Sequence, residues 1–129
     1  MTDKAFDKNL KVLVIEDSAI TVKIFRNFLN RLEIINVYWA ECGSDAIKIV
    51  AEEKLDLIIA DINIPEPNGL KVLEYIRNNE STKCIPVLIT TGESRENFIV
   101  YAMRHGANAY LVKPFTIEQL SEKLNKILN

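Results

Sequence analysis

The chain has 129 residues, of which 48% are hydrophobic and 26% are charged, and 16 basic and 18 acidic side chains give a formal net charge of −2. This length predicts one domain, and the lack of a basic excess argues against nucleic acid as a direct partner. No apolar run is long enough to span a membrane and the polar N-terminus does not look like a secretory signal, so we expect a cytoplasmic protein without membrane insertion.

Five short segments rich in β-branched and aromatic side chains predict strands. They lie at residues 11–16, 37–40, 57–60, 87–90 and 109–112. Three of them are nearly continuous apolar runs, which is typical of strands buried on both faces of a parallel sheet.

The segments between these strands have the apolar spacing of amphipathic helices. The spacing is clear over residues 24–32, 47–51, 70–76 and 117–127, and it is least regular over 94–105, where Gly106 is expected to end the helix. Thr116 and Gln119 predict a capping box at the start of the last helix. Five strands alternating with five helices predict an α/β fold with a doubly wound parallel sheet.

Polar residues end or directly follow the predicted strands, at the sheet edge where ligands bind in such folds. These residues are Glu16, Asp17, Asp61, Thr90, Thr91 and Lys113. Three carboxylates brought together repel one another, and their oxygens suit a hard divalent cation such as Mg²⁺ (or Mn²⁺). A lysine and a hydroxyl can hold phosphoryl oxygens, so the set predicts a phosphoryl-transfer site with one carboxylate as the nucleophile.

The same acidic residues have a plainer interpretation as local structure. Asp17 and Ser18 could cap the first helix, and Asp61 could begin a turn. Four strand ends that all supply compatible groups favour the phosphoryl-transfer site. Cys42 and Cys84 have neither metal-site nor disulfide-framework spacing, and we expect reduced, partly buried thiols.

Four motifs together resemble the receiver domains of two-component response regulators, especially the single-domain, CheY-like chemotaxis type. The motifs are VLVIEDS (12–18), LIIADINIPEPNGL (57–70), PVLITTG (86–92) and YLVKPF (110–115), and the resemblance covers about residues 9–128. It implies a (βα)5 flavodoxin-like fold with strand order 2-1-3-4-5. Residues 1–10 would form an N-terminal tail and residues 11–129 the receiver domain.

The resemblance also implies roles for individual residues. Asp61 matches the phosphoacceptor, and the cation would be held by Glu16, Asp17, Asp61 and the backbone carbonyl of Asn63. Lys113 matches the lysine that steadies the transferring group, and the Lys113–Pro114 peptide is expected to be cis.

Thr91 matches the switch hydroxyl of the family. Thr91 is preferred to Thr90 because it lies 30 residues after Asp61, and because strand alternation is expected to point Thr90 elsewhere. The sequence departs from the family pattern at Glu16, where aspartate is more usual, and at Gly92, where alanine is frequent.

The function implied is that of a signalling switch rather than an enzyme. A sensor histidine kinase or phosphotransfer protein would donate the phosphoryl group, and hydrolysis would reset the switch. The output surface would be the fourth helix, fifth strand and fifth helix, with Tyr110 as the aromatic switch and with Tyr101, Phe115 and Lys123 on the surface. The downstream target would be a protein, and the chain is expected to be a monomer or a weak dimer on phosphorylation.

Residues 94–129 hold five basic and three acidic side chains, so an acidic or mixed target peptide is plausible for this surface.

Three alternatives to this function remain open. A flavodoxin-like electron carrier would need a phosphate-binding loop where Glu16 and Asp17 stand. A haloacid-dehalogenase-type phosphatase would need a second aspartate at Asn63. A degenerate receiver would serve only as a binding module.

Overall fold

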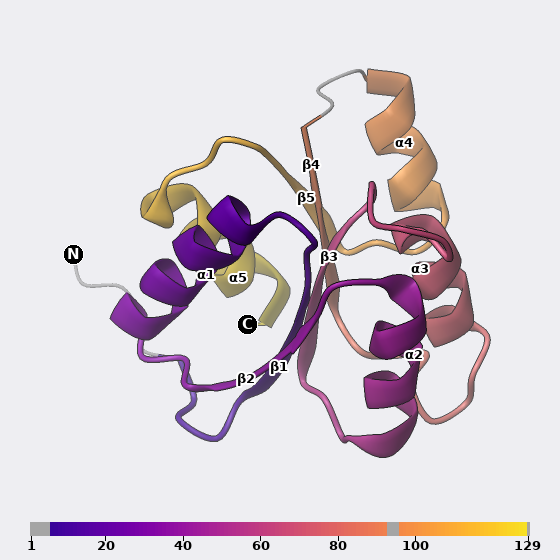
Figure 1. Ribbon diagram of the computed structural model, residues 1–129, viewed down its shortest axis with the longest axis horizontal. Helices are drawn as coiled ribbons and strands as arrows, with labels where there is room; N and C mark the ends of the chain where they lie inside the picture. Colours follow the sequence, from indigo (N-terminus) through magenta and orange to yellow (C-terminus); the bar gives the residue numbers. More distant parts are fainter. Residues whose placement is uncertain (1–5, 93–95, 129) are drawn as a thin grey trace.

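The computed structural model describes residues 6–92 and 96–128, in which five strands and five helices alternate (Figure 1). In chain order they are β1 (Lys11–Ile15), α1 (Ala19–Arg31), β2 (Asn36–Ala40), α2 (Gly43–Glu52), β3 (Leu57–Asp61), α3 (Gly69–Arg77), β4 (Val87–Thr91), α4 (Glu96–Arg104), β5 (Ala109–Val112) and α5 (Ile117–Leu128). All strand pairs are parallel, and the strand order is β2-β1-β3-β4-β5. The predicted fold class and strand order are confirmed.

Strand boundaries differ from the predicted ones by one residue at the carboxyl edge of the sheet. Glu16 lies just beyond β1, although its backbone N–H still donates to Ala40 O at 2.9 Å. Asp61 and Thr91 belong to β3 and β4, because pairing with the neighbouring strands continues to the end of each strand. The predicted helix over 94–105 corresponds to α4, and its first two residues lie outside the described part of the chain.

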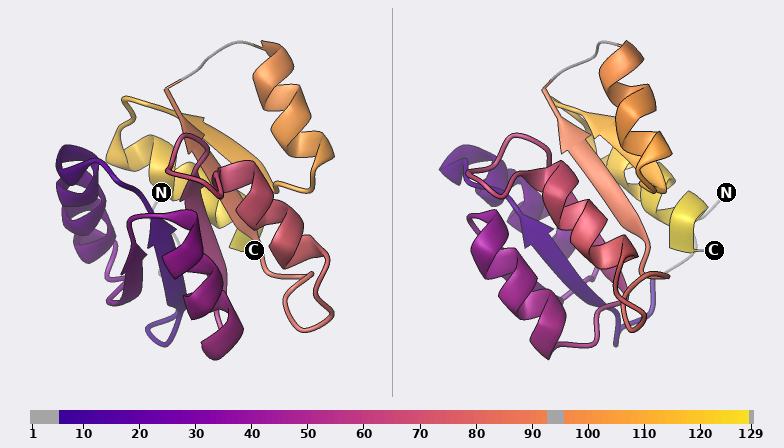
Figure 2. Two further views of the ribbon diagram at one scale, coloured as in Figure 1. Left: turned by 45° about the vertical axis from the view of Figure 1, so that its right-hand side comes forward. Right: turned by 90° about the vertical axis from the view of Figure 1, so that its right-hand side faces the viewer.

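Helices cover both faces of the sheet, with α1 and α5 on one face and α2, α3 and α4 on the other (Figures 1 and 2). Alternate strand residues point to these two layers, as expected for a buried parallel sheet. The residues that pack toward α1 and α5 are Val12, Val14, Leu57, Ile59, Leu88, Ala109 and Leu111. The residues that pack toward α2, α3 and α4 are Leu13, Ile15, Ile58, Ala60, Val87 and Ile89. We call these the α1/α5 face and the α2–α4 face.

Local signals in the sequence account for several helix ends. Thr116 Oγ1 accepts from Gln119 N–H at 3.1 Å, and Gln119 Oε1 accepts from Thr116 N–H at 2.9 Å, so the predicted capping box is present. Gly106 follows α4 with φ of 102°, a conformation that favours glycine at a helix C-terminus. Ser18 is the N-cap of α1, which confirms the plainer interpretation for that residue without removing Asp17 from the site.

Two glycines allow close backbone contacts at the loop after β3. A Cβ on Gly69 would lie 2.4 Å from Asp61 O, and a Cβ on Gly43 would lie 1.8 Å from Pro67 O. Because the atoms in the way belong to the backbone, neither position accepts a side chain without displacement of this loop. The loop that follows Asp61 is therefore held between α2 and α3.

Both cysteines are free, as expected, but only Cys42 is half-buried, since Cys84 is exposed in the connection between α3 and β4. The expected cis peptide at Lys113–Pro114 is present, and a second one at Glu66–Pro67 was not expected. Among the described residues, no helix has the length and apolar character needed to cross a membrane.

Candidate functional site

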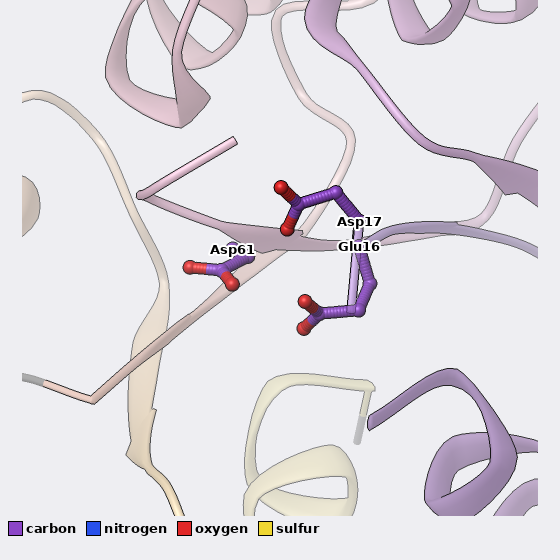
Figure 3. Close-up of side chains that lie close together, drawn as sticks. All are labelled: Glu16, Asp17 and Asp61. Carbon is purple, nitrogen blue, oxygen red and sulfur yellow. The ribbon is translucent and has the colours of Figure 1, made fainter. Parts of the chain in front are cut away.

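Three carboxylates converge at the carboxyl edge of the sheet (Figure 3). One carboxylate oxygen from each of Glu16, Asp17 and Asp61 lies within 4.8 Å of those of the other two. Glu16 and Asp61 are buried, with 1% and 4% of their surfaces exposed, whereas Asp17 is exposed. Residues far apart in the sequence are therefore brought together by the parallel order of β1 and β3.

Lys113 joins the two buried carboxylates. Its Nζ donates to Asp61 Oδ2 at 2.6 Å and to Glu16 Oε1 at 2.8 Å, and its side chain is 21% exposed. Its backbone N–H donates to Thr91 O at 2.8 Å, which extends the β4–β5 ladder by one residue beyond β5. The cluster holds more carboxylates than ammonium groups, and this imbalance favours a bound cation.

Backbone donors hold the remaining oxygens of the buried carboxylates. Ser18 N–H donates to Glu16 Oε2 at 3.1 Å, and Asn63 N–H donates to Asp61 Oδ1 at 2.9 Å. Each buried carboxylate thus accepts a hydrogen bond at both oxygens, which fixes its orientation. The Asn63 residue itself is exposed beside the site.

Burial and charge act in opposite directions on the titrating groups of this cluster. Burial raises the pKa of Glu16, with a smaller contribution from the charge of Asp61, while Lys113 and the Ser18 N–H act against this rise. Burial alone would lower the pKa of Lys113, but its hydrogen bonds to Asp61 and Glu16 outweigh burial and raise that pKa above its usual value. Lys113 is therefore an ammonium at neutral pH.

The two threonines at the end of β4 lie on opposite faces of the sheet. Thr91 alternates with Ile89 on the α2–α4 face, the face to which Tyr110 of β5 belongs by register. Thr90 alternates with Leu88 on the α1/α5 face, where Asp61 follows Ile59 in the same way. The expectation that strand alternation turns Thr90 away from Asp61 is wrong, because Asp61 is itself a strand residue on that face.

The residues expected at the output surface fall into two environments. Tyr110 is half-buried, and Lys123 Nζ of α5 lies 4.8 Å from the centroid of its ring. Tyr101 of α4 is 51% exposed. The Phe115 ring packs against Phe25 of α1, with the ring centroids 5.2 Å apart. The structure therefore brings Tyr110 and Lys123 together, and it places Phe115 beside α1.

An apolar patch on α1 borders the site and was missed in the sequence. Ile20 is 74% exposed, and Ile24 is 37% exposed although its spacing suggested a core position. A groove of about 280 Å³ lies between α1 and the segment after β5, lined by Thr21, Ile24, Lys113, Pro114 and Phe115. The sequence signal for this patch was Ile20, a large apolar side chain three residues after Asp17.

The chain is similar to known proteins in both sequence and structure. A model of the response regulator receiver domain matches residues 12–125. The chain is 36% identical over 121 residues to chemotaxis protein CheY-3 of Vibrio cholerae, covering 94% of this chain and 93% of the relative. It is 34% identical over 118 residues to chemotaxis protein CheY of Pseudomonas aeruginosa, covering 92% and 95%.

Solved structures show the same arrangement of strands and helices. The chemotaxis protein CheY4 of Vibrio cholerae superimposes with a TM-score of 0.85 at 28% identity, over 92% of this chain and 98% of the other. The receiver domain of the sensor histidine kinase PA1611 of Pseudomonas aeruginosa, which was solved with magnesium in its active-site cleft, gives 0.85 at 23% identity, over 92% and 97%. These matches extend over nearly the whole chain.

Proposed function

The chain belongs to the response regulator receiver domain family, and from this premise we propose that it accepts a phosphoryl group on Asp61 and acts as a switch. The observation that carries the proposal is the environment of Asp61. Its buried carboxylate is oriented by Lys113 and by the Asn63 N–H, and it lies beside two further carboxylates. Such a group is held ready for attack on phosphorus, and a lysine is in place to meet the incoming oxygens.

In the proposed step, a carboxylate oxygen of Asp61 attacks the phosphorus atom of a phosphohistidine. The new P–O bond forms while the P–N bond breaks, and the electron pair of the broken bond stays on the imidazole nitrogen. Lys113 steadies the phosphoryl oxygens, and the Thr91 hydroxyl, at the last residue of β4, would reach them beyond the end of the strand although Thr91 follows the opposite face. Water later attacks the phosphorus and the P–O bond to Asp61 breaks. Inorganic phosphate departs, and the free Asp61 carboxylate is restored.

The acidic cluster fits a hard divalent cation, Mg²⁺ or Mn²⁺. Asp17, Asp61 and the backbone carbonyl of Asn63 would hold the ion, and buried Glu16 would position it. All of these are oxygen donors, which such ions prefer. When bound, the ion supplies positive charge that offsets the charge of the phosphoryl oxygens.

The phosphodonor would be a sensor histidine kinase or a phosphotransfer protein. The exposed Ile20 and the adjoining groove at Ile24 and Lys113 provide an apolar surface next to the acceptor, on which a donor protein could rest. We propose that the exchange takes place in the cytoplasm, with the protein as a monomer or a weak dimer.

The output would pass through α4, β5 and α5 to a target protein. Tyr110 is half-buried beside Lys123 and shares the α2–α4 face with Thr91, so a shift of Thr91 can reach its ring through neighbouring strands. Lys123, Lys126 and Arg104 favour an acidic or mixed target segment. Because the relatives include chemotaxis proteins, we propose that the target protein acts in chemotaxis.

The proposal is tested by incubating wild-type protein, Asp61→Asn and Asp45→Asn with Mg²⁺ and a small phosphodonor. Asp45 lies exposed in the first turn of α2, so its variant is a charge-matched control. We expect acid-labile labelling of the wild type and the control and no labelling of Asp61→Asn. Equal labelling of all three would contradict the assignment of Asp61.

A further inference from the structure

Thr90 lies beside the acceptor aspartate and takes no part in the transfer step proposed for Asp61. Thr90 and Asp61 are register partners in the neighbouring strands β4 and β3, which places their backbones about 4.8 Å apart. Both follow residues that pack on the α1/α5 face, Leu88 and Ile59. Glu16 and Lys113 also continue the alternation of that face, after Val14 and Leu111. Thr90 therefore forms part of the wall of the acceptor site.

The hydroxyl of Thr90 is buried without a partner. The residue is 1% exposed, and Oγ1 has no hydrogen-bond partner among the described residues. A buried unpaired hydroxyl lowers stability, whereas a valine of the same shape would fill this position without that cost. The buried Thr82 differs, because its Oγ1 donates to Ile76 O at 2.8 Å. Among the described residues, the hydroxyl of Thr90 therefore makes no hydrogen bond that would stabilise the resting protein.

Both carboxylate oxygens of Asp61 already accept a hydrogen bond in the resting protein. Lys113 donates to Oδ2 and the Asn63 N–H donates to Oδ1. Phosphoryl transfer changes this balance, because the phosphoryl oxygens carry more negative charge than the carboxyl group and compete for the ammonium of Lys113. When Lys113 turns toward those oxygens, the carboxyl group of Asp61 loses a donor.

We propose that Thr90 is a positioning residue for the acceptor, whose hydroxyl donates to the Asp61 carboxyl group when Lys113 turns to the phosphoryl oxygens. The inference rests on the proposed function of Asp61. The P–O bond to Asp61 forms and the P–N bond of the donor breaks, and Thr90 keeps its proton throughout. The hydroxyl makes its hydrogen bond in the transferring state and not in the resting state. An interaction made only in the transition state accelerates the reaction.

Three variants separate this role from a structural one. Thr90→Val removes the hydroxyl, Thr90→Ser keeps it, and Thr82→Val removes a paired hydroxyl far along the chain from the site. Urea unfolding is measured together with the initial phosphorylation rate, using a small phosphodonor below saturation and saturating Mg²⁺. For Thr90→Val we expect a higher unfolding midpoint and about a tenfold slower rate, the effect of one hydrogen bond to a charged group. Thr90→Ser should keep the wild-type rate, and Thr82→Val should lower the midpoint and leave the rate unchanged.

Several outcomes overturn the inference. They are a wild-type rate in Thr90→Val, a rate in Thr90→Ser as slow as that of Thr90→Val, or a Thr90→Val protein that is less stable than the wild type. Failure of the proposed function looks different, because the wild type would then not be phosphorylated, or Asp61→Asn would be.

Discussion

Replacing Lys113 by methionine removes the ammonium that joins the two buried carboxylates. Methionine keeps an unbranched stem that can fill the same space. Without the lysine, Glu16 Oε1 and Asp61 Oδ2 lose donors at 2.8 and 2.6 Å. The two side chains, which are 1% and 6% exposed, are then left close together with no opposite charge between them. The free energy of unfolding must fall.

The size of this loss follows from how far the group is buried. Breaking a fully buried ion pair by removing one partner costs about 3–5 kcal/mol. The Lys113 side chain is 21% exposed, so water screens part of the interaction and we expect the lower end of that range, about 3 kcal/mol. For a domain of this size, such a loss lowers Tm by roughly 10 °C.

The assay is urea unfolding in the presence of a chelator, applied to the wild type, Lys113→Met, Asp61→Asn and the double variant. Asp61→Asn in the Lys113→Met background should recover most of the loss, because it removes one of the two repelling charges. Saturating Mg²⁺ should narrow the gap between Lys113→Met and the wild type, since the cation replaces the missing positive charge. A Lys113→Met protein within about 1 kcal/mol of the wild type, a difference below the range for buried pairs, would refute this reasoning, as would a double variant that recovers nothing.

Four further substitutions concern residues outside the acidic cluster. Gly69→Ala should cost about 2 kcal/mol and slow phosphorylation, because its Cβ would lie 2.4 Å from Asp61 O. Gly92→Ala, for which no described atom lies within 4 Å of the added Cβ, should be neutral or slightly stabilising; the two glycines should thus differ clearly in urea unfolding. Arg77→Met should cost about 2 kcal/mol, because two half-buried carbonyls lose their donor, and thermal unfolding measures this loss. Thr116→Ala should cost about 1 kcal/mol through loss of the α5 cap, and wild-type stability in this variant would contradict the capping role.

Much of the fold follows from short-range patterns that the sequence displays directly. The apolar runs that became β1, β3 and β4 are buried on both faces, which is what the near-absence of polar residues in them indicates. The capping box at Thr116 and the helix end at Gly106 depend only on neighbouring residues, and both were predictable. The convergence of Glu16, Asp17 and Asp61 followed from the parallel order of the strands.

Features that depend on contacts between distant segments were not predictable in the same way. Arg77 donates to Gly106 O and Ile85 O, and so links α3 to the segments before β5 and β4, but nothing near it in the sequence indicates those acceptors. The face of Thr90 was predicted wrongly because the strand containing Asp61 is one residue longer than its apolar run. Ile24 fits the helical period and is nevertheless 37% exposed, because it lines the groove beside Lys113 and Phe115 and not the core.

The most direct test of the account is to identify the residue that carries the phosphoryl group. Wild-type protein is phosphorylated with a small phosphodonor and Mg²⁺, and the acyl phosphate is reduced with borohydride, which converts the modified aspartate to homoserine. Mass spectrometry of the proteolytic peptides then locates the change. We predict homoserine at residue 61 alone. Homoserine at Asp17, or an unmodified peptide at residue 61 in protein that carries the phosphoryl group, would contradict the account.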